Sequence, residues 1–222
     1  MIGTTRDDDS LGIWAILGAD PYSWEYLPFL AGEFGVYYAW EVSTLYPLAN
    51  YPSTFQAMTA ASGDFNVHCP SRRLARRWAE LGADAYLYMF SYAPPSNLYN
   101  ISANLGAYHG SELPFVFHHE LPNNSNDNNN HNIKGEELLS QQMMTYWANF
   151  ASTHNPNPNP QHNIHNDLPV WPKYDAKLDQ NINFDIPTTT VQDHLGSSGS
   201  LCDKFWDRTQ IGSFPAVCLS LY

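Results

Sequence analysis

One histidine and one run of carboxylates have the residue types and the setting for acid–base chemistry. His109 lies between Gly106 and Gly110, which let the backbone turn sharply and present the imidazole at the edge of a sheet. The acidic run Arg6-Asp-Asp-Asp-Ser10 lies 101 residues earlier, counted from its central aspartate. A carboxylate beside an imidazole holds its tautomer and stabilises the imidazolium that forms in acyl transfer. The residues alone therefore allow a general base with an aspartate partner, although an isolated loop histidine is more often structural or simply exposed.

Metal binding is the competing chemistry for these residues. Three adjacent carboxylates can bind calcium or remain solvated, but the downstream pattern of an EF-hand loop is missing. His109 with Glu112, or the adjacent His118, His119 and Glu120, are the other candidate ligand clusters. Adjacent residues do not share one helix face as the ligands of a His-Glu-x-x-His zinc motif do, and no second cluster has ligand spacing. We expect no metal and no other cofactor.

Composition sets the class of protein. The chain has 222 residues, of which 43% are hydrophobic and 14% aromatic, enough for a substantial core. Its formal net charge of −12 opposes binding to phosphate backbones, so we expect no nucleic-acid partner. Apolar runs are interrupted by Pro, Asn or charge well before the roughly 20 residues of a spanning helix, which predicts no membrane span.

The one basic cluster, four arginines within residues 72–77, falls on an expected helix over residues 71–81 that Gly82 ends. Leu74, Trp78 and Leu81 recur at helical spacing and predict its apolar face. The arginines are therefore expected on the solvated face, with their stems along the protein.

The elements around the candidate residues alternate in type. A strand end over residues 1–5 precedes the acidic run, and residues 11–60 favour short helices because Pro and Gly punctuate them. Beyond the arginine helix we expect a buried strand, a second helix, two short strands and two irregular stretches. These are, in the same order, residues 85–92, 136–153, 170–172 and 182–185, with an Asn-rich low-complexity loop at 121–132 and a Pro/Asn linker at 154–168. The alternation predicts an α/β fold.

Two segments resemble the type-B carboxylesterase and cholinesterase family. Gly106-Ala-Tyr-His-Gly-Ser-Glu-Leu-Pro-Phe-Val-Phe117 is similar throughout to the family segment that carries the catalytic histidine. Gly3-Thr-Thr-Arg-Asp-Asp-Asp-Ser10 resembles the segment Gly-x-Asn-Lys-Asp-Glu-Gly-Ser/Thr, with Asp8 at the position of the acid, where Glu is usual. The resemblance implies that His109 is the general base, that Asp8 orients it, and that Glu112 supports the loop from the second layer of contacts.

The resemblance also implies an incomplete fold. In this family the nucleophilic serine precedes the acid and the histidine, and Gly-x-Ser-x-Gly does not occur here. Gly196-Ser-Ser-Gly-Ser200 has the wrong spacing. We therefore expect residues 1–222 to form the C-terminal portion of an α/β-hydrolase, with an incomplete central sheet and flanking helices. Its expected partners are the N-terminal half of the same fold and a small-molecule ester substrate.

Three cysteines allow at most one internal bridge. The segments around Cys69 and Cys202 resemble the two halves of a late family disulfide, which implies that these two are joined and leaves Cys218 unassigned. The sequons at Asn100 and Asn123 are possible glycosylation sites and, with the disulfide, favour a secreted protein.

Two functions follow from the resemblance. The first is a serine carboxylic-ester hydrolase to which this chain supplies the acid and the histidine, so that the chain alone is inactive. The alternative is a non-catalytic, cholinesterase-like binding or adhesion protein.

Overall fold

The computed structural model describes residues 1–94, 104–119, 131–157, 168–195 and 201–209. Its centre is a sheet of four strands in the order β1 (Ile2–Thr5), β2 (Leu87–Phe90), β3 (Gln180–Phe184) and β4 (Thr190–Asp193). The first three are parallel, and β4 returns antiparallel to β3. Parallel neighbours need crossovers, which here contain helices, so the predicted α/β class is confirmed.

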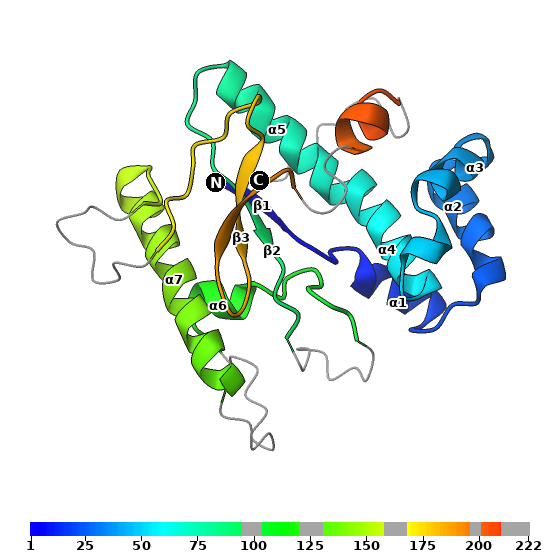
Figure 1. Ribbon diagram of the computed structural model, residues 1–222, viewed down its shortest axis with the longest axis horizontal. Coiled ribbons are helices and arrows are strands. Elements are labelled where there is room, and N and C mark those ends of the chain that lie inside the picture. The colour runs from blue at the N-terminus through cyan, green and yellow to red at the C-terminus, as the bar shows by residue number, and fades with distance from the viewer. Residues whose placement is uncertain (95–103, 120–130, 158–167, 196–200, 210–222) are drawn as a thin grey trace, which may run out of the picture.

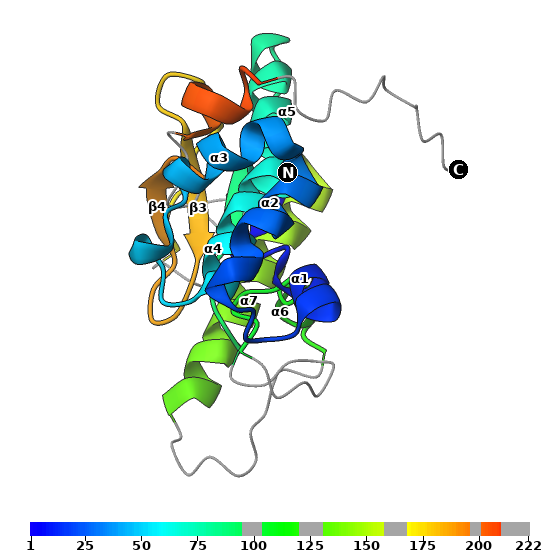
Figure 2. The same cartoon turned by 90° about the vertical axis from the view of Figure 1, so that its right-hand side faces the viewer.

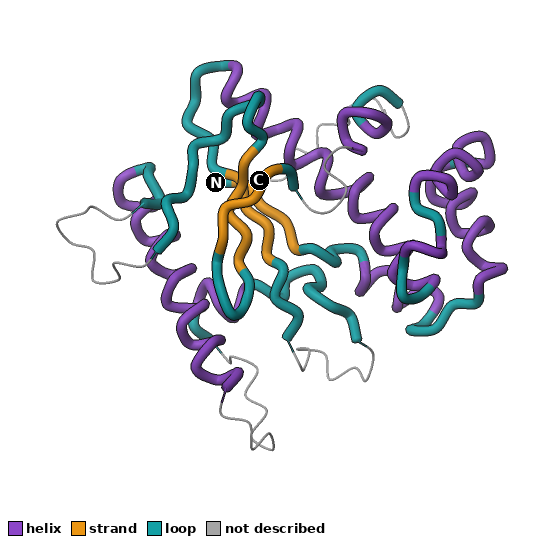
Figure 3. The backbone as a smooth tube through the Cα atoms, viewed as in Figure 1, coloured by secondary structure: helices purple, strands orange, loops and turns teal. Residues whose placement is uncertain are grey.

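Both faces of this sheet are covered by helices. Along β2, Phe90 belongs to one apolar cluster, whereas Leu87 and Met89 belong to another. The first cluster includes residues of α6 (Leu113–Phe117) and α7 (His131–Thr153), and the second includes Ala75 of α5 (Cys69–Glu80). Figures 1 and 3 show these helices on opposite sides of the strands. A strand buried on both faces explains the unbroken aromatic and apolar run that predicted it.

A group of short helices lies to one side of the sheet, as the punctuation by Pro and Gly predicted. They are α1 (Ser10–Leu17), α2 (Tyr26–Phe34), α3 (Val36–Leu45) and α4 (Thr54–Gly63). Figure 2 looks onto this group, and Leu30, Val42 and Met58 are among its fully buried core residues. Within the described residues, no helix combines the length and apolarity that crossing a bilayer requires.

One continuous rod connects this group to the sheet. It consists of α4, a π-helical segment Asp64–His68 and α5, which follow one another without a break and form one long diagonal in Figure 1. Ser53 caps its start by accepting a hydrogen bond from the Gln56 N–H at 3.2 Å. A π-helical turn inside a helix is rare and often marks a functional region.

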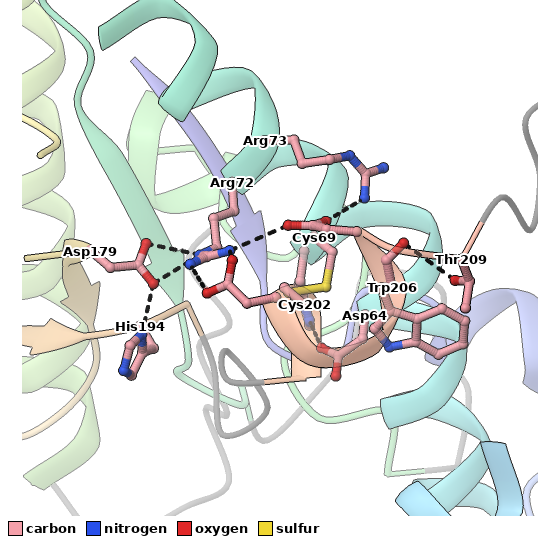
Figure 4. The surroundings of a disulfide bond; sticks show 12 residues. Asp64, Cys69, Arg72, Arg73, Asp179, His194, Cys202, Trp206 and Thr209 are labelled. Carbon is pink, nitrogen blue, oxygen red and sulfur yellow. Dashed lines mark hydrogen bonds and ion pairs between the residues drawn. A yellow bond between two sulfur atoms is a disulfide. The ribbon is translucent and has the colours of Figure 1, made fainter. Parts of the chain in front are cut away.

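A disulfide closes the fold around the rod, between the two cysteines that the family resemblance implied (Figure 4). Cys69, the first residue of α5, is bonded to Cys202, the first residue of a second π-helical segment (Cys202–Trp206). The two Cα atoms are 5.3 Å apart across a sequence separation of 133 residues. In the chain-entropy model a loop of this length stabilises the fold by about 4–5 kcal/mol.

The helix expected over residues 71–81 is α5, and Arg73 and Arg77 are exposed on it, but the expected apolar face was wrong. Arg72 is 1% exposed, whereas the predicted apolar residues Leu74, Trp78 and Leu81 are 46%, 43% and 66% exposed. Arg72 points inward because two carboxylates lie there and bind its guanidinium. Its Nε donates to both Asp179 oxygens at 2.9 and 2.8 Å, and its Nη2 donates to Asp203 at 2.6 Å. Figure 4 shows this cluster beside the disulfide.

Other boundaries also differ from expectation. The helix predicted from residue 136 begins at His131, and residues 170–172 form no strand, although Trp171 is buried and its Nε1 donates to the Leu87 carbonyl at 3.0 Å. The strand expected at 182–185 is β3. Residues 121–130 of the Asn-rich loop and 158–167 of the linker lie outside the described residues.

Replacing Arg72 by alanine should destabilise the protein strongly, because it leaves the buried Asp179 without its guanidinium and removes one of the two arginines that bind Asp203. We expect a loss of about 3–5 kcal/mol in the free energy of unfolding, measured by urea titration. The control is Arg77→Ala, where the side chain is 66% exposed and forms a surface ion pair with Glu80 at 3.3 Å. Equal losses for the two variants would contradict a structural role of the Arg72 cluster.

Candidate active site

Asp8 is held firmly at the end of β1. It is 6% exposed, and its Oδ2 accepts hydrogen bonds from the Thr5 N–H at 3.1 Å and the Thr5 hydroxyl at 2.9 Å. These bonds close a tight turn between the last residue of the strand and the first turn of α1. The remaining oxygen, Oδ1, lies 2.7 Å from Nδ1 of His109. The structure therefore brings together two sequence-predicted residues that are 101 positions apart.

The imidazole of His109 is fixed at one nitrogen and open at the other side. Because an ionised carboxylate can only accept, Nδ1 carries the proton and donates a hydrogen bond to Asp8. The side chain of His109 is 77% exposed, so Nε2 is the nitrogen available to a partner from outside. The hydrogen bond that His109 donates to Asp8, and the negative charge of Asp8, raise the pKa of His109 above the ordinary 6.5. This is the arrangement of an oriented general base.

The three neighbouring aspartates have separate contacts. The main-chain N–H of Asp7 donates to the Ala107 carbonyl at 2.9 Å, and its Oδ2 accepts from the Ala107 N–H at 2.8 Å. The carboxylate of Asp9 accepts from Asn66 Nδ2 at 2.9 Å. Asp8 is thus the member of the run that bonds to His109, and Asp7 instead ties the acidic run to the loop that carries His109.

This junction between the two loops also has contacts that sequence reasoning missed. The Ser10 hydroxyl donates to the Leu105 carbonyl at 2.7 Å and is fully buried. Gly106 has φ of +66°, and a Cβ there would overlap the carboxylate of Asp7. Neither contact has a local signal, because each joins positions about a hundred residues apart in the chain.

Glu112 lies three residues beyond His109, and its Oε2 makes no hydrogen bond to the described part of the histidine loop. That atom is buried and has no partner among the described residues, and the same holds for the Ser111 hydroxyl. Burial raises the pKa of Glu112, the charge of Asp8 raises it further, and His109 lowers it. The expected second-layer role of Glu112 stays a prediction.

The other candidate site residues from the sequence either make contacts elsewhere or lie outside the described residues. His118 Nδ1 lies 3.0 Å from the Ser140 hydroxyl. Among the described residues, no group of three or more His, Cys, Asp or Glu side chains is placed to hold a metal ion. Several candidates lie outside the described residues, namely Asn100, Glu120, Asn123, Cys218 and the small-residue run at 196–200.

With the geometry of the Asp8–His109 pair established, the comparison with protein families decides the affiliation. The model of the carboxylesterase family matches residues 38–199, more than half of the chain. The chain belongs to the carboxylesterase family. The matched region includes His109, Glu112 and Cys69, whereas Asp8 and Cys202 lie outside it. Membership supports ester hydrolysis in general and small-molecule esters as the substrate class.

Replacing Asp8 by asparagine should lower the pKa of His109, because the charge and hydrogen bond that stabilise the imidazolium are lost. NMR titration of the His109 Cε1 proton measures this shift. Asp9→Asn is the matched control, since Asp9 affects His109 only through its charge and should cause a smaller decrease. A larger decrease in the His109 pKa for Asp9→Asn than for Asp8→Asn would mean that Asp9, and not Asp8, is the carboxylate that bonds to the imidazole.

A Gly106→Ala variant should disturb the same junction. Its new Cβ meets the Asp7 carboxylate in addition to the strain of φ +66°, which costs on the order of 1 kcal/mol by itself. Gly82→Ala, at φ +79° with open space around it, carries the backbone strain alone. We expect Gly106→Ala to destabilise the protein more in thermal unfolding and to shift the His109 resonance. Equal melting temperatures and an unmoved resonance would argue against a tight junction.

Proposed function

We propose that this chain supplies the acid and the general base of a serine carboxylic-ester hydrolase. The observation that carries the proposal is the 2.7 Å contact between buried Asp8 and exposed His109. Family membership supports the reaction class. Asp replaces the Glu usual in this family, and the turn that Thr5 makes with Asp8 places the shorter side chain within reach of the imidazole.

In the proposed reaction, Nε2 of His109 takes the proton of a serine hydroxyl as the serine oxygen attacks the ester carbonyl. The resulting imidazolium is stabilised by Asp8 and gives its proton to the leaving alcohol as the acyl-enzyme forms. In the second half, His109 takes a proton from water as the water oxygen attacks the acyl carbon. The bond between the acyl carbon and the serine oxygen then breaks, the acid is released, and the imidazolium returns its proton to the serine oxygen. Because His109 must be neutral to start, the raised pKa predicts that kcat/KM increases as pH rises through it.

The nucleophile and the oxyanion hole are proposed to lie in an N-terminal half of the same fold, with residues 1–222 as its C-terminal portion. Among the described residues β1 pairs only with β2, which leaves its other edge available to a further strand. Glu112 Oε2 and the Ser111 hydroxyl are buried close to His109 in the chain and have no hydrogen-bond partner among the described residues. We propose that Glu112 supports the histidine loop from this position.

We further propose that the protein is secreted. The Cys69–Cys202 disulfide supports this, since such bonds persist in oxidising compartments. Many carboxylesterases are secreted as well. Glycosylation at Asn100 and Asn123 belongs to the same proposal.

The test compares variants in the whole protein that contains this chain, with p-nitrophenyl esters as substrates. We expect His109→Ala to lower kcat by on the order of 10⁶-fold and Asp8→Asn by about 10⁴-fold. His119→Ala is the control, because that neighbouring histidine is exposed and should leave kcat unchanged. The 222-residue chain alone should show no turnover, and saturable turnover that disappears in His109→Ala would overturn the assignment of the serine to another segment.

A fluorophosphonate probe separates the enzyme from the alternative. Labelling of one serine in the whole protein, lost in His109→Ala, supports the hydrolase. No labelling and no effect of His109→Ala would reject it in favour of a non-catalytic, cholinesterase-like binding or adhesion protein.

A further inference from the structure

One buried histidine, His68, lies outside the Asp8–His109 pair. His68 is 4% exposed and ends the π-helical segment of the rod, directly before Cys69. Asp64, at the start of the same segment, is 3% exposed. A titratable pair this deeply buried is costly unless every polar atom is matched, so its contacts show what it is placed to do.

Both ring nitrogens of His68 face acceptors. Nδ1 lies 2.9 Å from Asp64 Oδ1, and Nε2 lies 2.9 Å from the main-chain carbonyl of Thr5. A carbonyl and an ionised carboxylate only accept, so the ring must donate from both nitrogens and is an imidazolium. Burial alone would lower the pKa of His68, but the hydrogen bond and charge of Asp64 and the contact with Thr5 raise it overall.

Asp64 is in turn fixed from its other side. Its Oδ2 accepts from the Tyr46 hydroxyl at 2.6 Å, and that hydroxyl accepts from the Trp206 indole at 2.7 Å. Trp206 belongs to the segment that the disulfide attaches to the rod. The imidazolium is thus held by a network of fully packed side chains, which favours one geometry.

The residue that His68 binds is the one that holds Asp8. Thr5 offers its carbonyl to His68, and its N–H and hydroxyl to Asp8 Oδ2. The next residue, Arg6, donates its N–H to the Phe90 carbonyl at 2.9 Å and continues the β ladder. The peptide unit after Thr5 is therefore fixed on both sides at the point where the chain turns toward the candidate site.

We propose that His68 is a positioning residue for this site: through the Thr5 carbonyl, its buried imidazolium sets the Asp8 carboxylate that orients His109. The consequence for catalysis rests on the proposed function, but the positioning itself does not. The charged groups that face His68 are Asp64 and Asp8, and those that face His109 are Asp8, Glu112 and Asp9. His68 thereby also balances part of the negative charge buried at the end of β1.

Two matched variants separate the two contacts of His68. In His68→Gln the amide reaches about as far as Nε2 and keeps a donor for the Thr5 carbonyl. In His68→Asn it reaches only about as far as Nδ1 and keeps the contact with Asp64. We expect the His109 pKa, measured by NMR titration, to fall toward its ordinary value in His68→Asn and to stay raised in His68→Gln. In the whole protein, His68→Asn should lower kcat on the order of 10²-fold with little change in KM.

The proposal is overturned if folded His68→Asn leaves the His109 pKa unchanged, or if both variants lower it equally. A measurement without any variant keeps the test decisive where His68→Asn does not fold. Nitrogen-15 shifts of His68 should show both ring nitrogens protonated at about pH 7, where an ordinary histidine is mostly neutral, and a neutral ring would reject the proposal. Because these readouts need no nucleophile, absence of ester hydrolysis would reject the proposed function and leave this test standing.

Discussion

Thr5, the last residue of β1, is the point at which the sheet, the helical rod and the candidate site meet. Its three main-chain and side-chain polar groups are all bound, the carbonyl by His68 and the N–H and hydroxyl by Asp8. A strand end normally leaves polar groups to be satisfied by water or loops. Here they are satisfied by two charged residues of opposite sign, so the direction in which Asp8 faces is fixed by the same bonds that end the strand.

The rod transmits this constraint to the rest of the molecule. Its middle contacts Thr5 through His68, and within the next turn Cys69 and Arg72 bind the segment at 202–207. Arg72 also reaches Asp179, immediately before β3, so that both β1 and β3 are attached to the rod. The interior is closely packed, so a displacement of the rod would move the end of β1. It would also move Asp8, which contacts His109.

The sequence predicted the local elements well and the long-range contacts only by resemblance. Period and punctuation located β2, the short helices and most of α7, because these patterns depend on nearby residues. The pattern failed for Arg72, since the Asp179 and Asp203 carboxylates that draw it inward lie more than a hundred residues away. For the same reason the sequence left undecided which of the three aspartates contacts His109. Only the fold shows that the Asp7 carboxylate accepts from Ala107 and the Asp9 carboxylate from Asn66.

The candidate site is organised before any substrate or nucleophile contributes to it. Asp8 has no freedom to turn away from His109, because its other oxygen holds two donors of Thr5. The loop that carries His109 is also held in place, because Asp7 and Ser10 bind its main chain on both sides of Gly106. An oriented base contributes to catalysis only when it need not reorganise as charge develops. The buried contacts of this chain therefore serve to keep one exposed nitrogen, Nε2 of His109, in a constant position.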